Sequence, residues 1–183
     1  AATDLFGNSV AVSGTRVVVG TYGDDTVGTN AGSAYVYDLT SGTPTVPVHT
    51  LDNNFPAPGD LFGNSVAISG TRVVIGAYLD DAGAADAGSV YVYDVAGATP
   101  TLPVLSLNNP GPSAFDNFGR AIAVSGTRVV IGAVSESDGG ARVGTTFIYD
   151  LAGATPAVPV HTLNHPSPSA GDYFGYSVGI SGN

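Results

Sequence analysis

The sequence predicts an all-β protein built from four-stranded antiparallel sheets that are arranged as the blades of a β-propeller. One observation is a period: the stretch that starts at Asp4 returns at Asp60 and Asp116, 56 residues apart each time, and starts again at Asp172. A fixed period is typical of solenoids and propellers, whose units bury their faces on one another. The other is that β-branched and aromatic runs alternate with Gly-rich turns, without helical periodicity.

The period divides the chain into three blade repeats, 4–59, 60–115 and 116–171, and a partial repeat, 172–183, which we expect to add one inner strand. Strands are expected in the first repeat at roughly residues 8–13, 15–21, 33–38 and 45–51. The run Val17-Val18-Val19 lacks polar alternation, as in strands that are buried on both faces. Pro47 in the fourth strand predicts a sheet edge, because proline cannot donate to a ladder.

The composition excludes several functions. Five Arg and no Lys stand against 15 Asp and Glu, a net charge of −10 that disfavours nucleic acids and anionic membranes. Cysteine is absent, which excludes disulfides and thiol chemistry. No apolar run approaches the roughly 20 residues of a membrane-spanning helix, so membrane insertion is not expected. Methionine is absent, position 1 included, so we expect a processed product or a piece of a longer chain.

Two short motifs recur in every repeat and resemble those of a known family. Phe-Gly precedes the first strand at residues 6–7, 62–63, 118–119 and 174–175, and a Gly-led turn ends the second strand at residues 20–22, 76–78 and 132–134. This order resembles the FG-GAP repeat, the blade unit of the integrin α-subunit β-propeller and of many bacterial surface proteins. The resemblance implies a non-enzymatic extracellular or cell-surface module for adhesion or scaffolding.

The calcium site that this family often carries between the first two strands is not expected here. That connection is only Ser13-Gly14-Thr15 in the first repeat, and its copies also lack a carboxylate. A calcium loop needs several oxygen ligands at alternating positions. We therefore expect no cofactor, with weak calcium binding at the acidic loops described next as the alternative.

Acidic loops that follow the second strand of each repeat are the candidate ligand-binding site. In a four-stranded meander these loops share one rim with the connections between repeats, and the resemblance places the family's ligands there. The candidate residues are Asp24, Asp25, Asp80, Asp81, Glu136 and Asp138, with Tyr22 and Tyr78 as stacking platforms. A ring of carboxylates could bind a cation, a basic partner or sugar hydroxyls. The alternative is that the Asp side chains cap backbone N–H groups of the loops and that the Tyr rings belong to the core.

Three functions remain open. The first is the interaction module, with a protein or glycan ligand; the second is a lectin-like propeller; the third is a hydrolase that uses rim carboxylates. Hydrolysis of a glycoside needs two carboxylates in different environments, and near-equivalent copies argue against it, so no catalytic residue is assigned. The positions that break the repeat are Phe115, Arg120, Glu136, Asp138 and Arg142, so an asymmetric site would lie in repeat 3. Three scattered His residues give no zinc spacing, so no metal ligand is assigned.

Arg at the start of each second strand and Asp at the end of each third strand predict a repeated cross-strand ion pair: Arg16 with Asp38, Arg72 with Asp94, and Arg128 with Asp150. Three blades are too few to close a ring, because closed propellers have about four to eight. We therefore expect self-association, with a homodimer giving six blades, or packing against neighbouring repeats, and we do not expect a stable monomer.

Overall fold

The computed structural model describes residues 4–136 and 142–182, which form three four-stranded antiparallel sheets and no helix. Blade 1 contains β1 (Ser9–Ser13), β2 (Arg16–Thr21), β3 (Ser33–Asp38) and β4 (His49–Asp52). Blade 2 contains β5 (Ser65–Ser69), β6 (Arg72–Ala77), β7 (Ser89–Asp94) and β8 (Leu105–Asn108). Blade 3 contains β9 (Phe118–Ser125), β10 (Arg128–Ala133), β11 (Thr145–Asp150) and β12 (His161–Asn164). The all-β class and the blade-like sheets are as predicted.

Each blade is a meander whose strands pair in chain order. In blade 1 the ladder of β1 and β2 runs to the pair Ser13 and Arg16, so a two-residue turn joins them, with Gly14 at φ 59°. Left-handed backbone is the conformation that this kind of hairpin needs and that glycine adopts without strain. The first three strands lie within one residue of their predicted bounds.

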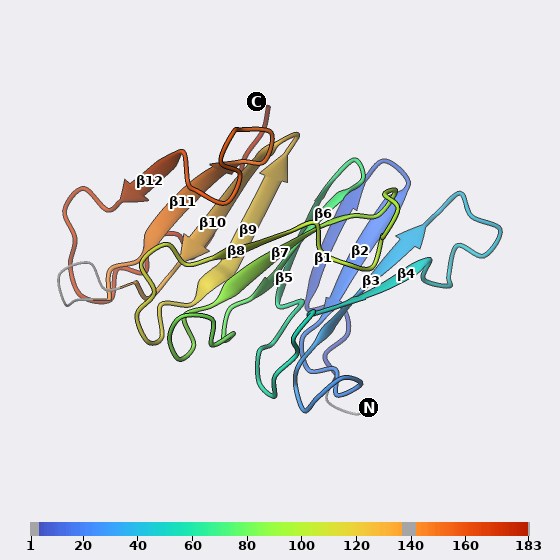
Figure 1. Cartoon of the computed structure of the whole chain (residues 1–183), viewed down its shortest axis with the longest axis horizontal. Coiled ribbons are helices and arrows are strands. Elements are labelled where there is room, and N and C mark those ends of the chain that lie inside the picture. Colours follow the sequence, from blue (N-terminus) through green and yellow to red (C-terminus); the bar gives the residue numbers. More distant parts are fainter. Residues whose placement is uncertain (1–3, 137–141, 183) are drawn as a thin grey trace.

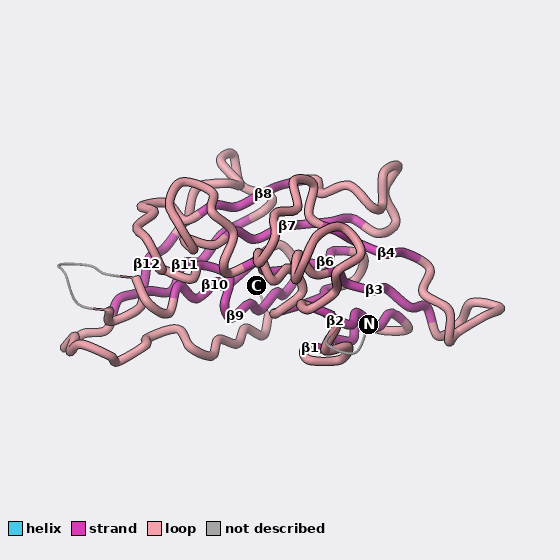
Figure 2. Tube along the Cα trace, turned by 90° about the horizontal axis from the view of Figure 1, so that it is seen from below, coloured by secondary structure: helices cyan, strands magenta, loops and turns pink. Residues whose placement is uncertain are grey.

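The fourth strand is shorter than predicted. It begins at His49 rather than near residue 45, so Pro47 precedes the strand and does not lie within it. Val48 N still donates to Val36 O at 2.7 Å just ahead of the ladder. The edge position is correct, because β4, β8 and β12 are outer strands of their sheets, and Figure 2 shows them at the periphery.

The three sheets lie side by side, and their cores lie between neighbouring blades (Figure 1). Phe62 of the second Phe-Gly motif is fully buried between blades 1 and 2, beside Tyr91 and Tyr93. Phe118 is buried in the same way between blades 2 and 3, beside Phe147 and Tyr149. Placing the Phe-Gly rings in the core between blades is therefore correct for these two copies.

Glycine allows the backbones of neighbouring blades to approach closely. A Cβ atom on Gly76 would lie 2.2 Å from Gly119 O of the next blade. At Gly20 a Cβ would lie 2.0 Å from Gly63 O, and at Gly132 it would lie 2.1 Å from Gly175 O. The glycine just before the last residue of β2, β6 and β10 is thus required by close contact with the next repeat.

The partial repeat docks on blade 3 without forming a strand. Residues 172–182 are irregular, so the predicted extra inner strand is absent from them. Phe174 N donates to Val143 O at 2.7 Å, and the Arg120 guanidinium lies over the Tyr176 ring at 5.5 Å. A strand needs a ladder partner, and the three sheets of the described residues include no pairing with residues 172–182.

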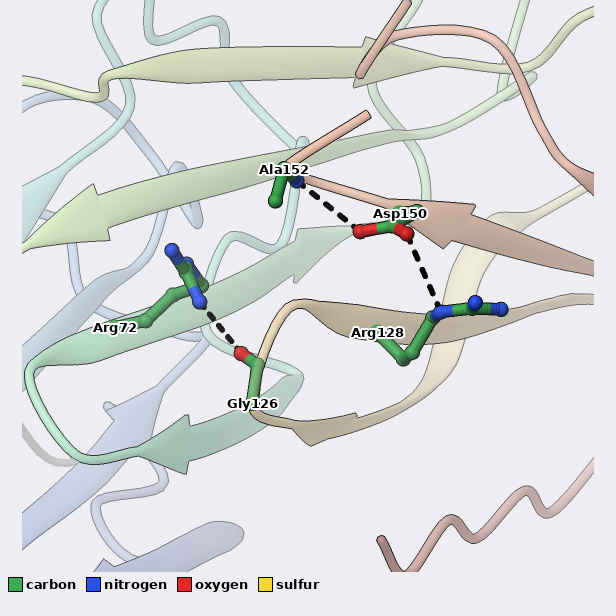
Figure 3. A network of polar contacts seen from close by, with 5 residues as sticks. All are labelled: Arg72, Gly126, Arg128, Asp150 and Ala152. Carbon is green, nitrogen blue, oxygen red and sulfur yellow. Dashed lines mark hydrogen bonds and ion pairs between the residues drawn. The ribbon is translucent and has the colours of Figure 1, made fainter. Parts of the chain in front are cut away.

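The predicted Arg–Asp pairs stand opposite each other in all three ladders. Arg128 Nε lies 3.5 Å from Asp150 Oδ2, whereas Arg72 donates to Gly126 O of the next blade (Figure 3). Asp150 Oδ1 also accepts from Ala152 N at 3.1 Å. Arg72 therefore links two blades, a role that its position opposite Asp94 did not predict.

Candidate functional site

The candidate site is the rim at which the β2–β3 and β6–β7 loops meet the connections between blades. We call this surface the acidic rim and define it by residues 22–32, 53–60, 78–88 and 109–116. Hydrogen bonds join its parts: Phe62 N donates to Ala31 O at 2.9 Å, and Gly59 N donates to Thr29 O at 2.9 Å. The predicted convergence of these loops is therefore present between blades 1 and 2. Phe118 N donates to Ala87 O at 2.9 Å in the same way between blades 2 and 3.

The first Asp of each pair is buried and bonded to a tyrosine. Asp24 is 4% exposed, and its Oδ2 accepts from Tyr35 OH at 2.7 Å while Oδ1 accepts from Thr26 N at 2.8 Å. Burial opposes ionisation of Asp24, but the hydrogen bonds from Thr26 and Tyr35 outweigh it and lower its pKa. Burial and the bond to Asp24 raise the pKa of Tyr35. Asp24 is therefore an ionised structural acceptor.

Asp80 repeats this arrangement in blade 2. Its Oδ2 accepts from Tyr91 OH at 2.6 Å and its Oδ1 accepts from Ala82 N at 2.9 Å. Asn53 Nδ2, from the connection before blade 2, donates to Asp80 Oδ2 at 3.4 Å. Burial, followed by the hydrogen bond to Asp80, raises the pKa of Tyr91. Through these hydrogen bonds Asp80 links the β6–β7 loop to the connection that precedes blade 2.

The second Asp of each pair lies at the surface. Asp25 Oδ1 accepts from Asn30 N at 2.7 Å, and Asp81 Oδ1 accepts from Asp86 N at 2.9 Å. Asn30 and Asp86 have left-handed φ angles of 50° and 52°, so each bond stabilises a tight loop end. Capping of the loops thus accounts for one oxygen of each carboxylate, while the exposed side chains of Asp25 and Asp81 remain accessible.

Asp60, the residue before the second Phe-Gly motif, is a buried acid. It is 3% exposed, and its Oδ2 accepts from Ala57 N at 2.8 Å and Asn53 Nδ2 at 3.0 Å. Burial, with the nearby Asp80 and Asp81 charges, raises the pKa of Asp60 to about 6, although the two hydrogen bonds oppose the shift. Asp116 has the same partners by position, Ser113 N at 2.6 Å and Asn109 Nδ2 at 2.8 Å.

Tyr22 and Tyr78 are half-buried. The Tyr78 ring lies under the Arg120 guanidinium at 5.1 Å from its centroid, and burial raises the pKa of this tyrosine. Arg120 also donates to Asn64 Oδ1 at 3.1 Å. The Tyr78 ring therefore already makes a cation–π contact within the chain.

Repeat 3 differs from the other two at the rim. Glu136 replaces the buried Asp, and Phe147 replaces the Tyr that binds it. Glu136 O accepts backbone hydrogen bonds from Val143 N and Gly144 N, both at 3.2 Å. Asp138 lies outside the described residues. The deviating Arg142 has its guanidinium over the Phe115 ring at 5.6 Å, a packing contact.

Sequence reasoning missed a pocket next to the acidic pair of blade 2. Its lining residues are Phe55, Asp80, Ala82, Tyr91, Ser106 and Asn108. Phe55 is 86% exposed, and its N–H donates to Asn53 Oδ1 at 3.0 Å, which fixes the loop below the ring. Repeats 2 and 3 have Gly111 and Ser167 at this position, so an aromatic residue that breaks the repeat was the available signal.

Two further findings concern metals and membranes. Among residues 4–136 and 142–182, no three His, Cys, Asp or Glu side chains are grouped so that they could hold a metal ion. The same residues include no helix with the length and apolar character needed to cross a membrane.

Comparison with known proteins gives a family and a fold. The family model of the FG-GAP repeat matches residues 1–37, 56–93 and 107–149. No curated protein matches the chain. Among solved structures, the chain is similar to the computationally designed Ika4 protein, with a TM-score of 0.54 and 19% identity over 91% of this chain and 78% of that one. It is also similar to a europium-containing methanol dehydrogenase, with a TM-score of 0.56 and 14% identity over 91% of this chain but only 26% of the enzyme. At such identities the likeness concerns the fold alone.

Proposed function

The chain belongs to the FG-GAP repeat family, and on this premise we propose that it is a non-enzymatic extracellular interaction module that binds a basic protein surface through the acidic rim. Repeats of this family are typical of extracellular proteins that act in binding. The proposal extends this general statement to one surface of the present chain and to the charge of its partner.

The observation that carries the proposal is that the two Asp residues of each pair have different structural roles. Asp24 and Asp80 are buried and hold the loops rigid, whereas Asp25 and Asp81 keep exposed carboxylates on the same rim. Rigid loops that present like charges favour recognition of an opposite charge, since little ordering is needed on binding. The net charge of −10 adds long-range attraction for a basic partner.

The environments of the rim carboxylates disfavour the hydrolase alternative. A glycosidase needs two carboxylates with different roles about 5–10 Å apart. Asp24 and Asp80 have equivalent hydrogen bonds to Tyr35 and Tyr91, so these two are not differentiated as an acid and a base. Asp60, the acid whose pKa is raised, is only 3% exposed, which leaves little access for a substrate. The likeness to a methanol dehydrogenase covers about a quarter of that enzyme and supplies no catalytic residue.

The Phe55 pocket supports a second candidate, a lectin-like module. An exposed aromatic ring beside amide, hydroxyl and carboxylate groups suits a sugar, whose apolar face can stack while its hydroxyls form hydrogen bonds. Asn108 Oδ1 accepts from Ser89 Oγ at 3.2 Å, which leaves the Asn108 amide protons for a ligand. The pocket includes neither Tyr22 nor Asp24, which the sequence analysis named among the candidate rim residues.

The test of the first candidate is a binding assay with immobilised chain and a panel of basic, neutral and acidic 12-residue peptides. The double variant Asp25→Asn/Asp81→Asn removes charge but keeps an oxygen that can accept the loop hydrogen bonds. We expect basic peptides to bind the wild type and to lose at least about tenfold in affinity for the variant, as two lost charge contacts imply. The matched control is Asp38→Asn/Asp94→Asn, which removes the same number of charges at two half-buried Asp residues that also cap turns but lie at the opposite end of their blades.

An equal loss of affinity in the control variant would show that net charge alone drives peptide binding. It would contradict the proposal that the acidic rim is the binding surface. A glycan array separates the two candidates: binding that disappears with Phe55→Ser and persists in Asp25→Asn/Asp81→Asn supports the lectin-like module instead. Turnover in a broad glycoside and ester screen would contradict both.

A further inference from the structure

One side of blade 1 is an exposed apolar surface, although the corresponding side of blade 2 is buried by its neighbouring blade. Phe62, Val66 and Ile68 of blade 2 are 0%, 7% and 8% exposed, because blade 1 covers them. Their counterparts one repeat earlier, Phe6, Val10 and Val12, are 60%, 57% and 66% exposed. We call these three residues the head face.

Blade 3 presents the surface that matches the head face. In blade 1, the residues that cover the buried side of blade 2 are Val18, Ala34, Val36 and Leu51, each 0% exposed. Their counterparts in blade 3 are Val130, Thr146, Ile148 and Leu163, which we call the tail face. Leu163 is 45% exposed, whereas Leu51 and Leu107 are 0% and 1% exposed in their covered blades. Val130 and Thr146 of the tail face are buried, at 7% and 5% exposed, so Leu163 is the part of this face that is open. The repeat therefore specifies which surface of blade 3 matches the head face.

We propose that two copies of this chain associate head face to tail face through a two-fold axis, giving a six-bladed ring, and that residues 172–182 compete with this association. Six blades lie within the range of about four to eight found in closed propellers. The two contacts of such a dimer repeat the contact of blade 1 with blade 2, so each buries residues whose counterparts are already packed between blades within the chain.

The competition arises because one position on blade 3 is already occupied. Phe62 N and Phe118 N donate to Ala31 O and Ala87 O, both at 2.9 Å, when one blade docks on the previous one. Phe174 N makes the corresponding bond to Val143 O at 2.7 Å, and Gly175 O lies against Gly132 as Gly119 O lies against Gly76. The second copy needs this same position for its Phe6-Gly7.

The C-terminal segment is held less firmly than the strand that would replace it. β1 pairs with β2 over five residues and is joined to it by a two-residue turn, so β1 stays with its blade. Residues 172–182 form no strand, and Phe174 is only half-buried. Because this segment is tethered to blade 3, it competes at a high effective concentration and weakens the dimer without preventing it.

The test is analytical ultracentrifugation of the full chain over a concentration series. Phe6→Ser should weaken the dimer at least about tenfold, since it removes an aromatic anchor from the centre of the contact. The matched control is Phe55→Ser, which removes a ring that is 86% exposed in a loop away from both faces and should leave the dimer unchanged. Phe174→Ser should tighten the dimer several-fold by releasing the competing segment.

Opposite signs for Phe6→Ser and Phe174→Ser, with folding of each verified by circular dichroism, support the proposal. A Phe174→Ser variant that weakens the dimer as much as Phe6→Ser would overturn it, because the segment would then be donated to the second copy as a strand. A monomer at all concentrations up to about 100 µM, which corresponds to binding weaker than about 5.5 kcal/mol, would overturn it too. Open polymers in place of a closed dimer would also contradict the two-fold arrangement.

Discussion

Replacement of Gly76 by alanine should weaken the contact between blades 2 and 3 and so lower the free energy of unfolding. The added Cβ would lie 2.2 Å from Gly119 O and 2.4 Å from Ser65 Oγ. Carbon and oxygen atoms settle at least about 1 Å further apart than this, and a backbone carbonyl cannot rotate away as a side chain can. Ser65 Oγ also donates to Gly119 O at 2.6 Å, so the methyl group would disrupt a buried hydrogen bond between the blades.

The magnitude follows from these two effects. Overpacking of a close contact costs about 1–3 kcal/mol, and a lost buried hydrogen bond costs about 1 kcal/mol more. We expect Gly76→Ala to lower the free energy of unfolding by about 3 kcal/mol in urea denaturation followed by circular dichroism, which corresponds to a decrease in Tm of roughly 6–12 °C.

Gly42→Ala is the matched control. A Cβ on Gly42 would meet nothing within 4 Å, so this substitution should change stability by less than about 0.5 kcal/mol. The reasoning is refuted if Gly76→Ala is as stable as the control, because the two backbones would then not approach as closely as the contact between Gly76 and Gly119 requires.

Three further predictions concern the rim and its surroundings. Tyr91→Phe should lower the free energy of unfolding by about 1.5–3 kcal/mol in urea denaturation, because it removes a hydrogen bond to the Asp80 carboxylate. Tyr149→Phe should be neutral or stabilising, because that buried hydroxyl has no hydrogen-bond partner among the described residues. A larger loss of stability for Tyr149→Phe than for Tyr91→Phe would contradict both assignments. The raised pKa of Asp60, about 6 against an ordinary 3.8, means that its contribution to stability is fully present below pH 3.8 and is lost as the pH rises through 6. Asp60→Asn should therefore gain about 2.5 kcal/mol relative to wild type between pH 4 and pH 8, and a difference that does not change with pH would show that the acid is already ionised in the fold. The melting temperature should be the same in calcium and in a chelator, and an increase of several degrees in calcium would identify a metal site on the acidic loops.

The local elements could be predicted because their determinants are local. The Val17-Val18-Val19 run, the Gly14 turn and the alternating tyrosines each specify a strand or a hairpin through steric preferences that the chain carries with it. The fourth strand was predicted too long because Pro47 interrupts the run that precedes it, and only pairing with β3 shows where the ladder starts.

The candidate site was predicted in part. The convergence of the acidic loops with the connections between blades follows from the order of a meander, which the repeat revealed. The separation of Asp24 from Asp25 into a buried and an exposed carboxylate did not follow, because it depends on which of two adjacent side chains reaches Tyr35. Phe55 was overlooked because its only signal is a break in the repeat, against Gly111 and Ser167, and such a break does not show that the ring lies beside Asp80 and Tyr91 of the next blade.

The sequence by itself determined the repeating unit, its strands and the glycines that neighbouring blades need, because each of these is encoded again in every period. Only the tertiary structure decided the environment of each copy. Phe6 and Phe62 have nearly the same neighbours in sequence, yet one ring is 60% exposed and the other is fully buried. Likewise, Arg72 turns to Gly126 while Arg128 pairs with Asp150. The physical reason is that burial and pairing depend on whether another blade lies across the sheet, which no stretch of a single repeat can specify.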